Sequence, residues 1–150
     1  MQVEWTSDWI WSLALILFTM ILHVLVLARV FRLIIGAYDG AKASRRGAPI
    51  RASMLVMAFI LSAITLHALE AACWGMAYLL LGALPDARMA MLYSLNAMTT
   101  FGHVTFDLAN QWKLMGALEA LNGILLFGLS TAFMFALLVR LNFADEHRQA

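Results

Sequence analysis

Three long stretches of the chain are almost continuously apolar, and shorter polar segments separate them. They cover roughly residues 9–33, 53–81 and 114–141. A helix needs about 20 residues to cross the hydrocarbon core of a bilayer. Each stretch is therefore predicted to form a transmembrane helix, and the predicted fold class is an all-α membrane protein.

A shorter apolar segment, residues 87–98, lies between the second and third stretches. Pro85 and Asp86 precede it, and this pattern starts helices because the Asp86 carboxylate can accept hydrogen bonds from the free N–H groups of the first turn. About 12 residues are too few to span a bilayer, so the segment is predicted to be a buried or re-entrant helix. The polar stretch 99–105 follows it, and at membrane depth such a stretch needs protein or a water-filled cavity around it.

The composition supports the membrane class, because 63% of the residues are hydrophobic and only 13% are charged. A soluble domain is about half apolar and about a quarter charged. No linker-like stretch or internal repeat divides the chain, so residues 1–150 are predicted to form one membrane domain. Cys73 is the only cysteine and cannot form an intrachain disulfide. Glu4 and Asp8 precede the first stretch, where a signal peptide would be basic, so no signal peptide is expected there.

The charges predict an orientation in the membrane. Basic residues gather around the loop between the first two stretches, where Asp39 is the only acid: Arg29, Arg32, Lys42, Arg45, Arg46 and Arg51. Positive charge is retained in the cytoplasm. The loop 36–52 and the C-terminus are therefore predicted to be cytoplasmic and the N-terminus to be outside.

The same charges bear on partners and chemistry. The net charge is only +1, so the basic loop is expected to contact anionic lipid headgroups rather than nucleic acid. No nucleophile–base pair, phosphate-binding loop or cluster of metal ligands stands out along the chain. We therefore expect neither an enzyme nor a metal site.

Several runs of residues in the second half of the chain match a known arrangement. They are Tyr93-Ser94-Leu95 leading to Met98-Thr99-Thr100-Phe101-Gly102, the run 112–123 that begins Trp-Lys-Leu-Met-Gly, the run 128–132, and His67-Ala68-Leu69-Glu70 with Trp74 and Tyr78 beyond it. Together these runs resemble the tetrameric potassium-channel pore-domain family, in particular its small bacterial two-pore-domain-like members. The resemblance covers roughly residues 53–141.

This resemblance implies a complete architecture. Residues 53–82 would be an outer helix, 87–105 a pore helix with a filter-like loop, and 114–141 an inner helix, while residues 1–35 would be an extra peripheral helix. One such loop cannot enclose a pathway, whereas four around a cyclic axis can, so a C4 homotetramer is expected. The expected location is the bacterial inner membrane, and the only expected ligands are monovalent cations in the loop.

The filter-like loop departs from the family pattern at its second half. It comprises Thr99, Thr100, Phe101, Gly102, His103, Val104 and Thr105. The family reads Thr-x-Gly-Tyr-Gly-Asp, and its consecutive carbonyl groups replace the hydration shell of the ion. Either His103-Val104-Thr105 replaces Tyr-Gly-Asp, or Gly-Asp is deleted, and we favour the deletion because it keeps the downstream run in step. Both alignments predict that potassium selectivity of the usual kind is lost.

Three outcomes remain open for this loop. It could form a short and poorly selective filter, a filter gated by protonation of four copies of His103 near one axis, or a packed plug that does not conduct. His103 could instead point sideways and hydrogen-bond behind the loop. The expected function is thus a cation-channel-like protein with an atypical filter, and the alternative is a non-conducting scaffold or interaction protein.

Other residues carry competing interpretations. Glu70 is ionisable within a predicted span, which is costly and therefore points to function; with His67 and Tyr93 it is expected to support the pore helix. Gly123 and Gly128 allow either close helix packing or a gating bend.

Two further interpretations concern charged and histidine side chains. Glu119 is expected either to interact with the dipole at the start of its helix or to face an outer vestibule. His23 and His67 both fall near mid-membrane depth, so a distant alternative is a haem-binding electron-transfer protein.

Overall fold

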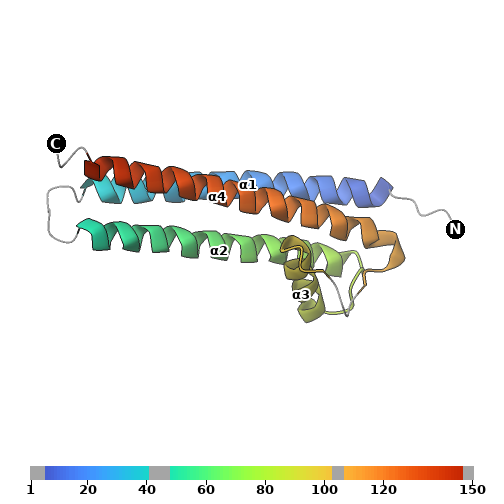
Figure 1. Cartoon of the computed structure of the whole chain (residues 1–150). Coiled ribbons are helices and arrows are strands. Elements are labelled where there is room, and N and C mark those ends of the chain that lie inside the picture. The colour runs from blue at the N-terminus through green and yellow to red at the C-terminus, as the bar shows by residue number, and fades with distance from the viewer. Residues whose placement is uncertain (1–5, 41–47, 103–106, 147–150) are drawn as a thin grey trace.

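The computed structural model describes residues 6–40, 48–102 and 107–146, and every regular element in these ranges is a helix. The long helices are α1 (Thr6–Gly40), α2 (Ala48–Leu80) and α4 (Lys113–Glu146). The short ones are α3 (Ala87–Met98) and a single 3-10 turn, η1 (Asn110–Trp112). Figure 1 shows the three long helices side by side, with α3 set across one end of the bundle.

The three predicted membrane spans are confirmed as helices long and apolar enough to cross a bilayer. The helices extend beyond the apolar stretches; α1, for example, covers 35 residues. Hydropathy marks where apolar side chains end, whereas backbone hydrogen bonding continues through the polar residues that follow. α1 and α4 run in the same direction and α2 runs against both (Figure 1).

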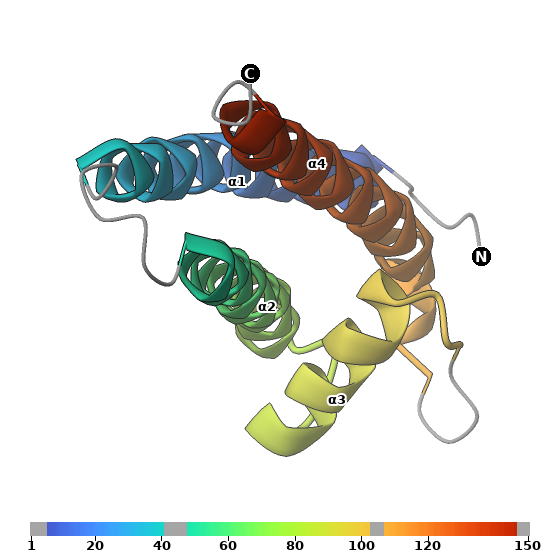
Figure 2. The ribbon, with the colours of Figure 1, turned by 60° about the vertical axis from the view of Figure 1, so that its left-hand side comes forward.

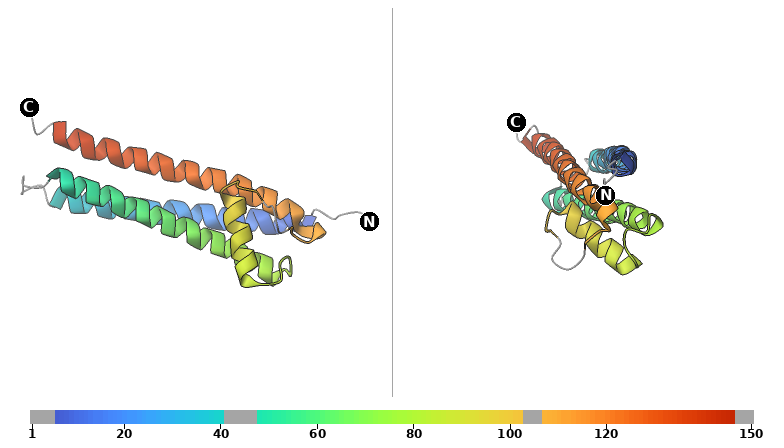
Figure 3. Two further views of the ribbon diagram at one scale, coloured as in Figure 1. Left: turned by 60° about the horizontal axis from the view of Figure 1, so that its bottom comes forward. Right: turned by 90° about the vertical axis from the view of Figure 1, so that its right-hand side faces the viewer.

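The short helix α3 has the bounds that the sequence predicts. Asp86 has extended backbone dihedrals, and its side chain accepts a hydrogen bond from the N–H of Met89 at 2.9 Å. This bond satisfies one of the N–H groups that a helix leaves unpaired at its start. α3 packs mainly against α2 and α4, on the side away from α1, as Figures 2 and 3 show.

The interior contains two large apolar clusters, a small third one around Met98 and Leu126, and a layer of buried polar side chains. One cluster lies around α3 and includes Trp74, Tyr78 and Met115. The other lies toward the opposite end and includes Leu27 and Phe59. Several fully buried polar side chains come between these clusters along the three long helices and form a polar layer: Thr19, His23, Glu70 and Asn122.

The first helix, expected to be an extra peripheral element, makes extensive contacts within the subunit. α1 packs against both α2 and α4, and its buried polar side chains include Thr19 and His23. A buried polar side chain needs partners, and both Thr19 and His23 have partners on the other long helices. α1 is therefore an integral part of the bundle.

The outward faces of the long helices are apolar. Large hydrophobic side chains are exposed along all three, among them Ile10, Leu17, Leu25, Met54, Leu61, Ile64, Leu121, Ile124 and Phe135. Such continuous apolar surface is stable against lipid or against another protein, and it would be costly in water.

Candidate functional site

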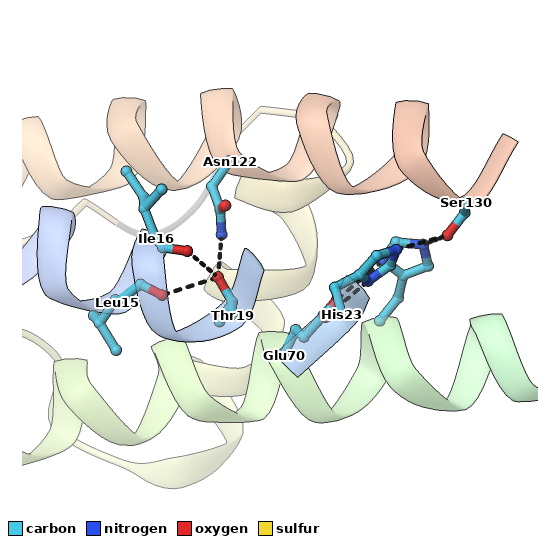
Figure 4. Close-up of polar contacts among 8 residues, drawn as sticks. Leu15, Ile16, Thr19, His23, Glu70, Asn122 and Ser130 are labelled. Atoms are coloured by element: carbon cyan, nitrogen blue, oxygen red, sulfur yellow. Dashed lines mark hydrogen bonds and ion pairs between the residues drawn. The ribbon is translucent and has the colours of Figure 1, made fainter. Parts of the chain in front are cut away.

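The polar layer centres on Glu70 of α2. Its carboxylate receives a hydrogen bond from His23 Nδ1 at 2.8 Å and lies 3.3 Å from His67 Nδ1. The Nε2 atoms of the two imidazoles both approach the Ser130 hydroxyl, at 3.1 Å for His23 and 3.0 Å for His67. The cluster therefore joins α1, α2 and α4 in the centre of the bundle (Figure 4).

A second polar contact lies next to this cluster. Asn122 Nδ2 donates a hydrogen bond to Thr19 Oγ1 at 2.9 Å, and Thr19 Oγ1 donates to the Leu15 carbonyl at 2.9 Å (Figure 4). Sequence reasoning missed Thr19 and Asn122. A signal was present, because Thr19 and His23 are four residues apart and so occupy one face of the same helix.

The expectation that Glu70 and His67 support the short helix stays a prediction, and their observed hydrogen bonds have other partners. The hydrogen bonds of both side chains described above run to α1 and α4, with none to α3. His67 also stacks on Phe127 of α4, with ring centroids 4.2 Å apart. His67 and Glu70 lie on one face of α2, as expected, and their hydrogen bonds connect α2 to α4 and α1.

The arrangement of the two histidines bears on the haem alternative. Their ring centroids are 5.1 Å apart and the rings are tilted by 42°. Both Nδ1 atoms point to Glu70 and both Nε2 atoms to Ser130. An axial pair needs one nitrogen from each ring on opposite sides of an iron. These rings lie side by side, so the described geometry does not favour haem ligation.

The short helix is held by a different carboxylate, Glu119 of α4. Tyr78 Oη donates to Glu119 Oε2 at 2.6 Å, and Ser94 of α3 hydrogen-bonds to the other oxygen of Glu119. The Ser94 hydroxyl also lies 2.7 Å from the Ala71 carbonyl oxygen. Glu119, Ser94 and Tyr78 are buried. Both expectations for Glu119 are therefore wrong: it is neither in the first turn of its helix nor facing a vestibule.

Tyr93 lies on the same buried face of α3. Its ring packs edge-on against Tyr78 with centroids 5.3 Å apart, and a Cβ at Gly116 would overlap the Tyr93 hydroxyl. Burial, together with the Glu119 carboxylate, raises the pKa of the Tyr93 phenol above its ordinary value. The neutral phenol therefore fits the expected supporting role, which stays a prediction.

The two glycines of the predicted inner-helix bend lie in different surroundings. A Cβ at Gly123 would overlap the backbone of Met98 at the end of α3, whereas a Cβ at Gly128 would meet nothing within 4 Å. α4 continues without interruption through both positions. Gly123 therefore allows a close approach of two helices, and a gating bend at either residue stays a prediction.

The filter-like loop begins as a helix cap. The N–H of Thr100 donates to Ala97 O at 2.9 Å, and the N–H of Phe101 donates to Asn96 O at 3.0 Å. These are the two bonds of a Schellman motif, with Thr99 as the C-cap residue. His103, Val104 and Thr105 lie outside the described residues. Phe101 is 77% exposed, so its side chain leaves the bundle.

The backbone of this loop visits the left-handed region twice. Thr100 has φ of 55° and Gly102 has φ of 88°, while Phe101 between them is not in that region. Glycine tolerates positive φ at little cost, whereas a β-branched residue is strained there. When residues alternate between the left-handed region and other backbone conformations, successive peptide groups can point to the same side of the chain.

Thr100→Gly is accordingly expected to raise the free energy of unfolding by about 1 kcal/mol, because it relieves the left-handed strain at the capping position. Thr99→Gly is the matched control, since Thr99 has φ of –84° and donates its hydroxyl to Leu95 O at 2.7 Å. It should lower stability. Denaturant unfolding in detergent compares the two, and equal effects of both glycines would contradict the strain at Thr100.

Comparisons with known proteins found no matching family model, no matching curated protein and no matching solved structure.

Proposed function

We propose that the chain is the subunit of a homotetrameric, cation-channel-like membrane protein whose filter-like loop is shortened and atypical. The observation that carries the proposal is the placement of α3. It is too short to span a bilayer, yet buried contacts hold it between two apolar helices long enough to do so. This placement supports the proposal, because four copies arranged around an axis would each present the loop at the end of α3 to that axis.

The loop itself supports attraction of cations. It leaves the C-terminal end of α3, and helix dipoles make this end partly negative. The left-handed backbone at Thr100 and Gly102 allows neighbouring carbonyl groups to point to the same side of the loop. Carbonyl oxygens arranged in this way are the ligands that replace the hydration shell of alkali cations.

The exposed apolar surfaces supply faces on which four copies could assemble and meet lipid. A single chain cannot surround a pathway, so conduction needs copies around an axis. The same architecture without ion flux would be a scaffold, so a flux measurement distinguishes a channel from a scaffold.

The test is ion flux through purified protein in liposomes, with sodium substituted for potassium and with protein-free liposomes as control. The mass of the detergent-solubilised particle gives the number of subunits. We expect a tetramer that passes both cations at comparable rates. Strong rejection of sodium would contradict the atypical filter, a tetramer without flux would favour the scaffold, and a monomer would contradict the proposal.

A further inference from the structure

We propose that His23, His67 and Glu70 bind one divalent transition-metal ion of the zinc type in each chain. Their candidate ligand atoms all lie within 4.8 Å of one another. Two imidazole nitrogens and one carboxylate are a ligand set that zinc takes, and such a set leaves one tetrahedral position open. This proposal concerns the interior of a single subunit and does not depend on whether the protein conducts ions.

The spacing of the ligand atoms fits a small ion. Zinc bonds to imidazole nitrogen and carboxylate oxygen are about 2 Å long, so ligand atoms at tetrahedral angles lie about 3.3 Å apart. His67 Nδ1 and Glu70 Oε2 are 3.3 Å apart already, and His23 Nδ1 is 2.8 Å from Glu70 Oε1. Opening this second pair by about half an ångström would bring it to the same spacing.

One side of the cluster lacks hydrogen-bond partners. Glu70 Oε2 and His67 Nδ1 are buried and face each other at 3.3 Å without hydrogen-bond geometry, and neither hydrogen-bonds to any other described residue. Glu70 itself is fully buried. Buried polar atoms without partners are rare in folded proteins and call for an explanation such as an ion. A carboxylate in a membrane span is also costly unless it serves a function.

Ser130 contacts the Nε2 atoms of both histidines, which lie opposite the Nδ1 atoms that face Glu70. A metal on both Nδ1 atoms leaves a hydrogen on each Nε2, and the two lone pairs of the Ser130 hydroxyl can accept both. With two neutral imidazoles and no metal, Ser130 can serve both Nε2 atoms only by donating to one and accepting N–H from the other, so one imidazole turns the lone pair of its Nδ1 toward Glu70. The unpaired His67 Nδ1, 3.3 Å from Glu70 Oε2, fits this arrangement. Two acceptor atoms then face each other, and a metal ion between them would remove their repulsion.

The cluster reaches the bundle surface at His67. A groove of about 240 Å³ runs between α2 and α4, and both His67 and Ser130 line it. The His67 side chain is 12% exposed, whereas the Glu70 side chain is fully covered. An ion would thus enter past His67, and the Glu70 carboxylate would offset part of its charge inside the bundle.

The experiment uses the full chain, purified in detergent and stripped of metal with a chelator. Cobalt(II) is the probe, because its visible absorption reports coordination by nitrogen and oxygen, and zinc is then added in competition. The chain has four histidines, so the background variant carries His103→Ala and His147→Ala. In that background we expect one cobalt ion per chain, displaced by zinc.

Variants then identify the ligands. His67→Ala and Glu70→Gln should each weaken binding by about 100-fold or more, and Ser130→Ala by about 10-fold, because it removes only the orienting hydrogen bonds. Glu119→Gln alters another fully buried carboxylate and is the matched control, which should bind normally. A zinc-induced rise in the unfolding temperature, present in the background chain and absent in Glu70→Gln, provides a reading that does not need the His67 variant to fold.

Three results would overturn the proposal. If cobalt(II) did not bind saturably, the cluster would be a hydrogen-bonded group without a metal. Unchanged affinity in Glu70→Gln would place the metal elsewhere, and loss of binding in the background variant would assign it to His103 or His147.

Discussion

Gly123→Ala will lower the free energy of unfolding by about 2–3 kcal/mol and displace the end of α3 from α4. A Cβ at this position would lie 2.7 Å from Met98 Cα and 2.8 Å from the Met98 carbonyl carbon. Both atoms belong to the backbone of a capped helix end, so they cannot swing aside as a flexible side chain could. The added methyl group must therefore separate the two helices, and the loop that follows Met98 moves with them.

Gly128→Ala is the matched control for this substitution. It lies in the same helix, and a Cβ there would meet nothing within 4 Å. Alanine favours a helix over glycine by about 1 kcal/mol, so this variant should be neutral or more stable. Unfolding in detergent, followed by circular dichroism, compares the two variants. Similar stability of both would contradict the close approach at Gly123.

Glu119→Leu will lower the free energy of unfolding by about 2 kcal/mol, because it leaves the buried Tyr78 hydroxyl without its acceptor. Glu119→Gln should cost less than about 1 kcal/mol. Ser94 lies within hydrogen-bond distance of two acceptors, Ala71 O and Glu119 Oε1, but has only one hydroxyl hydrogen to donate. A glutamine amide donates to Ser94, which is then free to donate to Ala71, while the amide oxygen still accepts from Tyr78.

A double-mutant cycle with Tyr78→Phe isolates this interaction. Tyr78→Phe should destabilise the natural chain by about 1 kcal/mol but should stabilise the Glu119→Leu variant, because there it removes a buried hydroxyl that has lost its acceptor. The measurement is again unfolding in detergent. If the glutamine variant were as unstable as the leucine variant, the proposed hydrogen-bond pattern around Ser94 would be wrong.

Much of the fold could be predicted from the order of apolar and polar residues. The three spanning helices and the bounds of α3 follow from local features: runs of apolar residues longer than a bilayer is thick, and Asp86 before a short apolar segment. The predicted ends of the long helices were less accurate, because backbone hydrogen bonding continues beyond the point where hydropathy falls.

The candidate site was predicted only where its parts are close in sequence. His67 and Glu70 are three residues apart, so they could be grouped on one helix face. His23 is 47 residues from Glu70, and Ser130 is 107 from His23. The sequence also misled at Glu119, because a carboxylate near the start of a helix is usually explained by the helix dipole, and nothing local reveals Tyr78 and Ser94 beside it.

The order of residues was enough to predict an all-helical membrane-type chain with a short helix before its last span. Hydrophobic burial and helix capping act over neighbouring residues, so their pattern can be read along the chain. The packing of α1 against both other long helices, the contacts of Glu119 and Gly123 with α3, and the convergence of His23, His67 and Glu70 became visible only in the folded structure. These outcomes depend on which faces of distant helices meet, and packing in three dimensions determines that choice.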